Sequence, residues 1–234
     1  MIGSFLLEEI NSRGMSVNSW YGQYFSQNWY ENTFLVSAPE QIARVNEVRG
    51  AWNNLSDSGC HFTCIAMIIG VDPARLASAL KEKQFFKLDG DFPARRLNGK
   101  VCGLVWDCNA PHEQAPSVSL SQFWHPVFNR RIEINVSFVT KSSVSNHESG
   151  CLLVRGIRDR GNHVVFGTSA HSLLVAGVLG DDFYIWNPDT TSEDGGTSEE
   201  DNVFAKYSLR SFFEKHPNEE VEFWEYKVVV NSDE

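Results

Sequence analysis

Apolar residues over 60–69 recur at the spacing of one helix face, and they include Phe62, Ile65 and Ile69. Gly70 follows directly, where a residue in the left-handed conformation commonly ends a helix. A second helix is predicted at once, because Asp72 is a good N-cap and Pro73 suits a first helical position. The pattern therefore predicts two consecutive helices with a short turn between them.

From residue 131 the pattern changes to that of β-strands, with alternating or continuous short apolar runs. The sequence GDD at 180–182 is typical of a hairpin turn between two of these runs. A short helix is expected at 208–217, just before the last strand. The predicted strands are 131–139, 151–157, 163–167, 171–180, 182–188 and 220–230.

The remaining segments carry weaker signals. Residues 1–49 are rich in Asn, Ser and aromatic residues, and we expect an N-terminal extension that packs on the main domain, with a short helix at 38–50. Residues 86–130 are the least regular part, with a helix predicted near 119–128. Helices that precede a mostly antiparallel sheet predict an α+β fold, with N-terminal helices packed on the sheet of a domain spanning 50–234.

Composition narrows the class of protein. The 234 residues are 42% hydrophobic and 21% charged, as in ordinary globular domains. A formal net charge of -10 disfavours nucleic acid and anionic membranes as partners. The apolar runs are too short for a membrane span, and the N-terminus lacks the basic start of a secretory signal. A cytoplasmic location is the default expectation, and export as a bacterial effector, by a signal that this sequence does not display, is the alternative.

The cysteines are odd in number and loosely spaced, which favours reduced thiols over a disulfide framework. A CxxxC pair on a helix can contribute to a metal site, but no second ligand pair lies at zinc spacing. We therefore predict no metal and no cofactor. The five cysteines are Cys60, Cys64, Cys102, Cys108 and Cys151.

Cys60 lies at the start of its predicted helix, where the environment favours an ionised thiol. Ser58 or Asp57 is positioned to cap this helix. Unpaired backbone N–H groups and the helix dipole stabilise an anion there, so they lower a thiol pKa. A thiolate is a nucleophile, and the same N–H groups can stabilise an oxyanion. Cys64, one turn further along, is expected to be buried and inert.

A cysteine nucleophile needs a base, and His171 is the candidate because it opens a strongly apolar strand. The hairpin that follows returns the chain antiparallel, so its end at Asn187 is expected to lie beside His171. This predicts a triad of Cys60, His171 and Asn187. His163 is the alternative base, and Asp189 is the alternative orienting residue.

These motifs resemble papain-like cysteine peptidases, especially the branch that includes bacteriocin-leader-processing peptidases. The matching stretches are CHFTCIAMI at 60–68, HSLLVAG at 171–177, and the pair Asn187-Pro188, where that branch usually has Asp-Pro. Family members carry a Gln six residues before the nucleophile that helps to form the oxyanion hole, and this chain has Asn54 there. The resemblance covers about residues 50–230 and implies a papain-like fold.

The resemblance implies a cysteine peptidase that acts on a protein or peptide substrate through an acyl-thioester. In this scheme Cys60 attacks, His171 transfers the proton, Asn187 orients the imidazole, and Asn54 with the Cys60 backbone N–H binds the oxyanion. A glutamine deamidase or transferase effector on the same fold is one alternative. A non-catalytic papain-like binding domain, in which Cys60 is an ordinary core thiol, is another.

Overall fold

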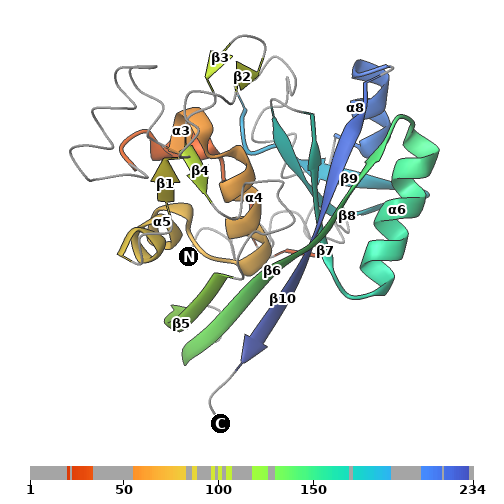
Figure 1. Cartoon of the computed structure of the whole chain (residues 1–234). Helices are drawn as coiled ribbons and strands as arrows, with labels where there is room; N and C mark the ends of the chain where they lie inside the picture. The colour runs from red at the N-terminus through yellow and green to blue at the C-terminus, as the bar shows by residue number, and fades with distance from the viewer. Residues whose placement is uncertain are drawn as a thin grey trace, which may run out of the picture.

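The computed structural model has an α+β fold in which helices pack on both faces of one antiparallel sheet (Figure 1). The chain is described over residues 20–21, 23–33, 55–82, 86–88, 96–97, 100–101, 104–106, 118–125, 130–168, 171–190, 207–217 and 219–231. The expected helix at 38–50 lies outside these residues. The coarse class predicted from the sequence is therefore confirmed.

The sheet has six strands in the order β5-β6-β10-β7-β8-β9, and every neighbouring pair is antiparallel. The C-terminal strand thus inserts between β6 and β7, and the β8–β9 hairpin forms one edge. The strands are β5 (Val118–His125), β6 (Arg130–Val144), β7 (His163–Gly167), β8 (Ser172–Leu179), β9 (Asp182–Trp186) and β10 (Val221–Asn231). Short pairs form from β1 (Phe86–Leu88) with β4 (Leu104–Trp106) and from β2 (Arg96–Leu97) with β3 (Lys100–Val101).

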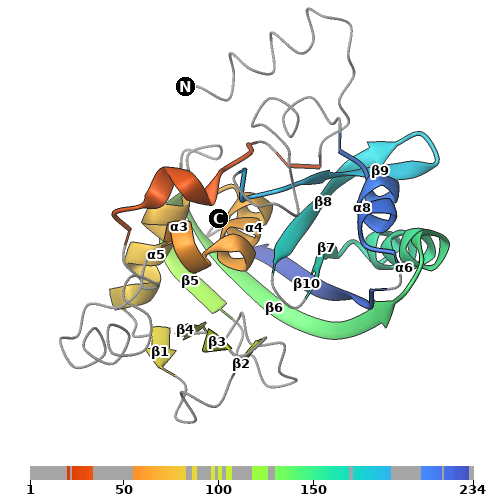
Figure 2. The same cartoon turned by 90° about the horizontal axis from the view of Figure 1, so that it is seen from above.

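The helices divide between the two faces of this sheet, as Figures 1 and 2 show. On one face lies α4 (Cys60–Ile69), preceded by α3 (Leu55–Ser58) and followed by α5 (Pro73–Glu82). On the other face lie α6 (His147–Asp159) and α8 (Leu209–Lys215). Alternate strand residues supply the two cores: Leu174 faces the α4 side, whereas Leu173 faces the α6 side.

The predicted helix pair is confirmed in detail. Nine of the ten residues of α4 are buried, from His61 to Ile69, so the helix fills the core on its side of the sheet. Gly70 ends it in the left-handed conformation, with φ 68°. Asp72 then caps α5, since its Oδ1 accepts hydrogen bonds from the N–H groups of Ala74 (2.9 Å) and Arg75 (3.1 Å).

The expected cap of α4 is wrong. Neither Ser58 nor Asp57 occupies the N-cap position, because residues 55–58 form the separate turn α3. Gly59 is the N-cap, and a glycine has no side chain with which to cap the helix. The first turn of α4 therefore keeps backbone donors that a side-chain cap would have used.

Two elements were predicted as the wrong type. The apolar run 151–157 is not a strand but part of α6, whose N-cap Asn146 accepts a hydrogen bond from Ser149 N (2.9 Å). Short apolar runs do not distinguish a strand from a helix. The helix predicted near 119–128 is instead β5, whose Val, Phe and Trp residues favour a strand and which pairs with β6.

Part of the N-terminal region belongs to the α4-side core. Tyr21, Tyr24 and Phe25 are buried there, and the 3-10 helix η1 (Gln27–Tyr30) follows them. Trp20 N donates to Ala176 O of β8 (2.9 Å). The division of the chain at 49/50 stays a prediction.

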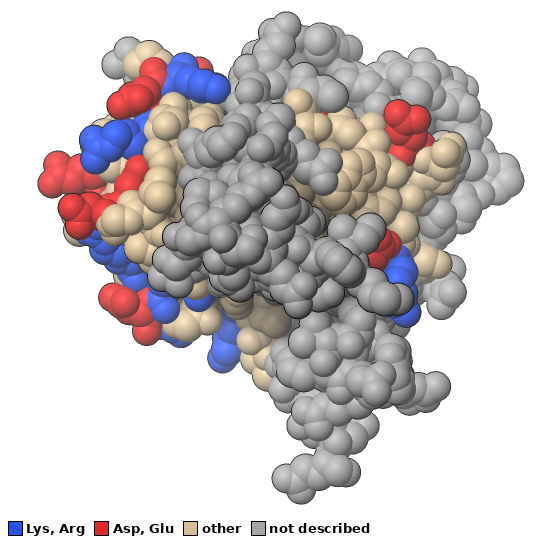
Figure 3. All heavy atoms as spheres, turned by 180° about the vertical axis from the view of Figure 1, so that it is seen from behind, with Lys and Arg blue, Asp and Glu red and all other residues tan. Residues whose placement is uncertain are grey.

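Among the described residues, no helix has the length and apolar character needed to cross a bilayer. On the face seen in Figure 3, acidic and basic side chains are interspersed over the side that carries α6.

Candidate active site

Three ends of secondary structure bring the predicted triad together. Cys60 is the first residue of α4, His171 directly precedes β8, and Asn187 directly follows β9. His171 Nε2 donates to Asn187 Oδ1 at 2.7 Å, and both side chains are buried. The hairpin register, with Leu174 opposite Trp186, explains why residues 16 apart in sequence become neighbours.

Gly59 lets the chain enter α4 directly after α3. Its N–H donates to Leu55 O at 2.8 Å, and a Cβ at this position would lie 2.4 Å from the same oxygen. Any larger residue would therefore push α4 away from α3 and displace Cys60. The glycine accounts for the tight turn that places the thiol at a helix start.

The Asn187 side chain is held in one orientation. Its Oδ1 accepts a second hydrogen bond, from Asp189 N at 2.9 Å, while Tyr24 Oη donates to the backbone carbonyl oxygen of Asn187 at 2.6 Å. Because Oδ1 faces the ring, the imidazole must carry its proton on Nε2 to donate to it. The other ring nitrogen, Nδ1, is then available to a thiol.

The pKa of the Cys60 thiol is lowered and the pKa of the His171 imidazole is raised, so each shift favours the charged form of its own group. Burial raises the pKa of Cys60, but the hydrogen bond and charge of His171, aided by backbone hydrogen bonds at Ser172 and His61, lower it below its usual value. Burial lowers the pKa of His171, but the hydrogen bond and charge of Cys60, followed by the hydrogen bond to Asn187, raise it overall. The arrangement favours a thiolate–imidazolium pair.

The other described thiols differ from Cys60. Cys64 is buried, as expected, and its Sγ points to Ser172 O at 3.8 Å. Burial and the charge of Cys60 raise its pKa well above the usual value. Cys151 is also buried, and burial together with Asp182 raises its pKa to about 11. Cys60 alone among these three thiols is partly exposed and has a lowered pKa.

The alternative base occupies a different environment. His163 Nδ1 lies 3.0 Å from Tyr21 Oη and 3.2 Å from Arg158 Nη1. Burial and the charge of Arg158 lower its pKa to about 4, so it stays neutral at neutral pH. The histidine that hydrogen-bonds the Cys60 thiol is His171.

Asp189 also has a part in the site, although it does not take the place of Asn187. Its backbone N–H fixes Asn187 Oδ1, and its carboxylate accepts a hydrogen bond from Asn28 Nδ2 at 3.3 Å. Its negative charge raises the pKa of His171. Asn54, the expected oxyanion residue, lies outside the described residues.

Sequence reasoning missed three polar residues that support the site. Tyr24 and Gln27 come from the N-terminal region: Gln27 Nε2 donates to Ser56 O (2.7 Å), and Gln27 N donates to Pro188 O (2.8 Å). Beside Cys60, His61 is hydrogen-bonded to Ser172 Oγ (3.1 Å) and to Tyr226 Oη (2.6 Å). The segment 20–30 shows no periodicity, so nothing in the sequence assigns it to the site.

The chain was compared with protein-family models, with curated proteins and with solved structures, and none of them matched it. A function for this protein therefore has to be argued from its own residues. Within the described part of the chain, one group could hold a metal ion, and it lies apart from Cys60: His147, Cys151 and Asp182.

Proposed function

We propose that this protein is a thiol hydrolase, most concretely a cysteine peptidase with a papain-like arrangement of its site. The observation that carries the proposal is the 2.7 Å bond between His171 Nε2 and Asn187 Oδ1, on an imidazole that also hydrogen-bonds Cys60. Nucleophile, base and orienting group then follow in one chain of contacts.

In the proposed mechanism Cys60 is the nucleophile, and His171 acts first as an acid and then as a base. The Cys60 thiolate attacks the carbonyl carbon of a peptide bond, and the backbone N–H groups at the start of α4 stabilise the oxyanion. The imidazolium of His171 gives its proton to the leaving amine, which leaves an acyl-thioester on Cys60. Water then attacks the thioester with His171 as base, which releases the acid and restores the pair.

Two opposite pKa shifts on adjacent groups favour this proposal over a non-catalytic domain. A structural histidine in a buried site is expected to be neutral, as His163 and His61 are, with pKa values lowered to about 4 and about 3. His171 is buried to about the same degree as His61 and more than His163, yet its pKa is raised. Strongly perturbed groups with a specific charge partner are typical of catalytic sites.

The test is selective alkylation of the native protein with low iodoacetamide near neutral pH, with the modified cysteine located by mass spectrometry. We expect Cys60 to react much faster than Cys64 or Cys151. His171→Ala should slow Cys60 by at least about tenfold, because one unit of thiol pKa is a factor of ten in thiolate. His163→Ala is the matched control and should leave the rate nearly unchanged.

Two results would contradict the enzyme proposal and leave a binding domain. One is alkylation of Cys60 that is no faster than that of Cys64 and Cys151. The other is an alkylation rate of Cys60 that His171→Ala does not change. If the pair is reactive, a mixture of unfolded proteins offered as substrate separates the two hydrolytic outcomes. A peptidase gives new peptide termini, whereas a glutamine deamidase converts side-chain amides to acids in intact chains.

A further inference from the structure

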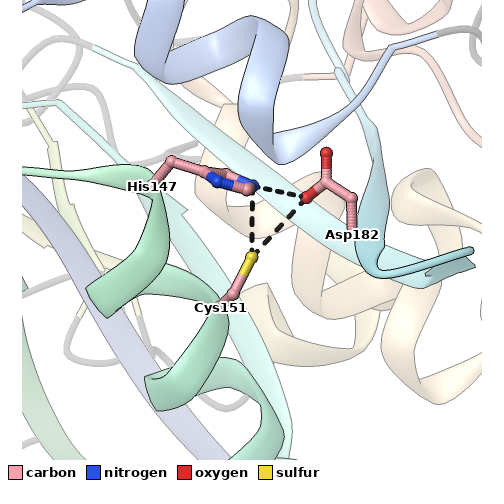
Figure 4. A group of neighbouring side chains, drawn as sticks. All are labelled: His147, Cys151 and Asp182. Carbon is pink, nitrogen blue, oxygen red and sulfur yellow. Dashed lines mark hydrogen bonds and ion pairs between the residues drawn. The ribbon is translucent and has the colours of Figure 1, made fainter.

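A second cluster, of His, Cys and Asp side chains, lies where α6 begins, on the opposite face of the sheet from α4 (Figure 4). His147 and Cys151 come from successive turns of α6, and Asp182 is the first residue of β9. His147 Nε2 lies 2.8 Å from Asp182 Oδ1 and 3.2 Å from Cys151 Sγ. The thiol and the carboxylate oxygen are 3.6 Å apart.

This cluster does not have the geometry of a second catalytic triad. In a triad the base uses one ring nitrogen for the nucleophile and the other for the orienting group. Here the thiol and the carboxylate both meet the same nitrogen, Nε2 of His147. Figure 4 shows the three groups converging on one point instead of forming a relay.

Three atoms that converge in this way are a typical set of metal ligands. Imidazole nitrogen, thiolate sulfur and carboxylate oxygen all bind Zn²⁺, at about 2.0–2.3 Å. In a tetrahedral site such ligands lie about 3.3–3.7 Å from one another. The three sides are 2.8, 3.2 and 3.6 Å, so the triangle reaches this size if its shortest side opens by about half an ångström and the nitrogen–sulfur side opens slightly.

Neighbouring groups hold the ligands in place. Asp182 Oδ2 accepts a hydrogen bond from Arg210 N of α8 at 3.2 Å, so its other oxygen stays directed at His147. His147 and Cys151 are four residues apart on one helix face, a spacing that places two side chains side by side. Outer partners of this kind orient metal ligands and strengthen binding.

The ligand charges and the exposure of the site also suit a divalent cation. The positive charges of Arg155 and Arg210, which act on Cys151, oppose a cation. A thiolate and a carboxylate together supply two negative charges, which balance the metal. The side chains of His147 and Asp182 are 20% and 12% exposed, so an ion and a water molecule can reach the site.

We propose that His147 Nε2, Cys151 Sγ and an oxygen of Asp182 bind a divalent transition metal, with zinc as the preferred ion and water as a fourth ligand. Binding displaces the Cys151 thiol proton to solvent and forms the three metal–ligand bonds. The site joins the start of α6, the start of β9 and, through Arg210, the start of α8.

This site is independent of the proposed catalytic one. Asp182 and Asn187 lie at opposite ends of β9, five residues apart, which corresponds to about 17 Å along a strand. The metal is therefore expected to brace the closed end of the β8–β9 hairpin, while its open end carries His171 and Asn187. Success or failure here leaves the alkylation test of Cys60 unaffected.

The experiment is a Co²⁺ titration of the full, untagged chain after removal of metals. Bound Co²⁺ is expected to give a thiolate-to-metal charge-transfer band and the visible bands of a tetrahedral ion. Cys151→Ser should abolish the charge-transfer band, and Asp182→Asn, which keeps an acceptor for Arg210 N, should weaken binding by at least about tenfold. Cys60→Ser is the matched control and should bind like the wild-type chain.

Two results would overturn the proposal. One is a wild-type chain that shows no thiolate-to-cobalt band at Co²⁺ concentrations well above that of the protein. The other is a band that survives Cys151→Ser or disappears in Cys60→Ser, which would place the ion elsewhere. If Cys151→Ser folds poorly, Asp182→Asn tests the same site, and unchanged Co²⁺ affinity in that variant would also contradict the proposal.

Discussion

At the scale of single residues, the proposed reactivity of Cys60 is expected to depend on the hydrogen bond from His171 to Asn187. The lowered pKa of Cys60 and the raised pKa of His171 both favour the thiolate–imidazolium form of the pair. Asn187→Ala removes a contact that favours the imidazolium, so the pKa of His171 should fall and that of Cys60 should rise. We expect alkylation of Cys60 near pH 6 to slow by about tenfold, measured as a pH–rate profile.

The same profile contains its own control. Above about pH 9 the thiol of either protein ionises without help, so the two rates should converge. Asn187→Asp keeps an oxygen acceptor for His171 Nε2 and should restore the rate near pH 6. Coincident pH–rate profiles for Asn187→Ala and the wild-type chain would mean that Asn187 does not influence the pKa values of Cys60 and His171.

Single residues of the site were predictable from the sequence only where local rules apply. Cys60 follows from a helix start, and Asn187 follows from hairpin geometry once His171 opens a strand. Tyr24 bonds Asn187 across 163 positions, and no short-range pattern encodes a contact at that separation. The cluster of His147, Cys151 and Asp182 escaped notice for a related reason, because a predicted strand at 151–157 hides an i, i+4 pair.

At the scale of elements, α6 shows why that strand was predicted. The run CLLVRGI is apolar enough for a strand, but the buried positions of the helix follow a helical period: Gly150, Cys151, Val154 and Ile157. Leu152 remains 62% exposed, so part of the apolar run faces solvent. The sequence signal for a helix was Asn146, a good N-cap residue just before the apolar run, and the strand prediction did not take it into account.

Two glycines of α6 give a test of this helix. A Cβ at Gly156 would meet only Arg160 Nη1, at an ordinary 3.7 Å, so Gly156→Ala should raise the free energy of unfolding by about 0.5–1 kcal/mol. A Cβ at Gly150 would lie 3.0 Å from the buried Phe213 ring. Gly150→Ala should therefore lower the free energy of unfolding by about 1 kcal/mol or more.

Urea unfolding of both variants beside the wild-type chain decides the point. The same substitution is expected to have opposite signs six residues apart, because one position faces the core and the other does not. In a strand, Gly156→Ala would carry no helix-propensity gain. A loss of stability in Gly156→Ala would therefore contradict the helix.

At the scale of the whole molecule, β10 connects the two cores, with Trp224 on the α4 side and Phe223 on the α6 side. Glu225 of the same strand is a buried charge held by Arg160 and Asn162, which lie where α6 leads into β7. Such a charge is tolerated only when it is paired. The sequence predicted the strand but not these contacts, because Arg160 and Asn162 lie 65 and 63 residues before Glu225.

Glu225 should make stability depend on pH in the acid range. Burial raises its pKa, but the hydrogen bonds of Arg160 and Asn162 outweigh burial and lower the pKa below 4.5. The stabilisation is then complete above about pH 4.5 and is lost as the pH falls through the folded-state pKa. Glu225→Gln should cost about 1–2 kcal/mol at neutral pH and reduce this acid dependence, as measured by urea unfolding at several pH values.

Glu222, three positions earlier on β10, is the matched control. Its ion pair with Lys141 is partly exposed, and exposed pairs contribute about 0–1 kcal/mol. Glu222→Gln should therefore change stability by less than about 0.5 kcal/mol and leave the acid dependence intact. Equal losses in the two variants would mean that burial of Glu225 carries no special weight. A larger loss for Glu225→Gln would instead show that the join between β10 and the end of α6 depends on one paired charge.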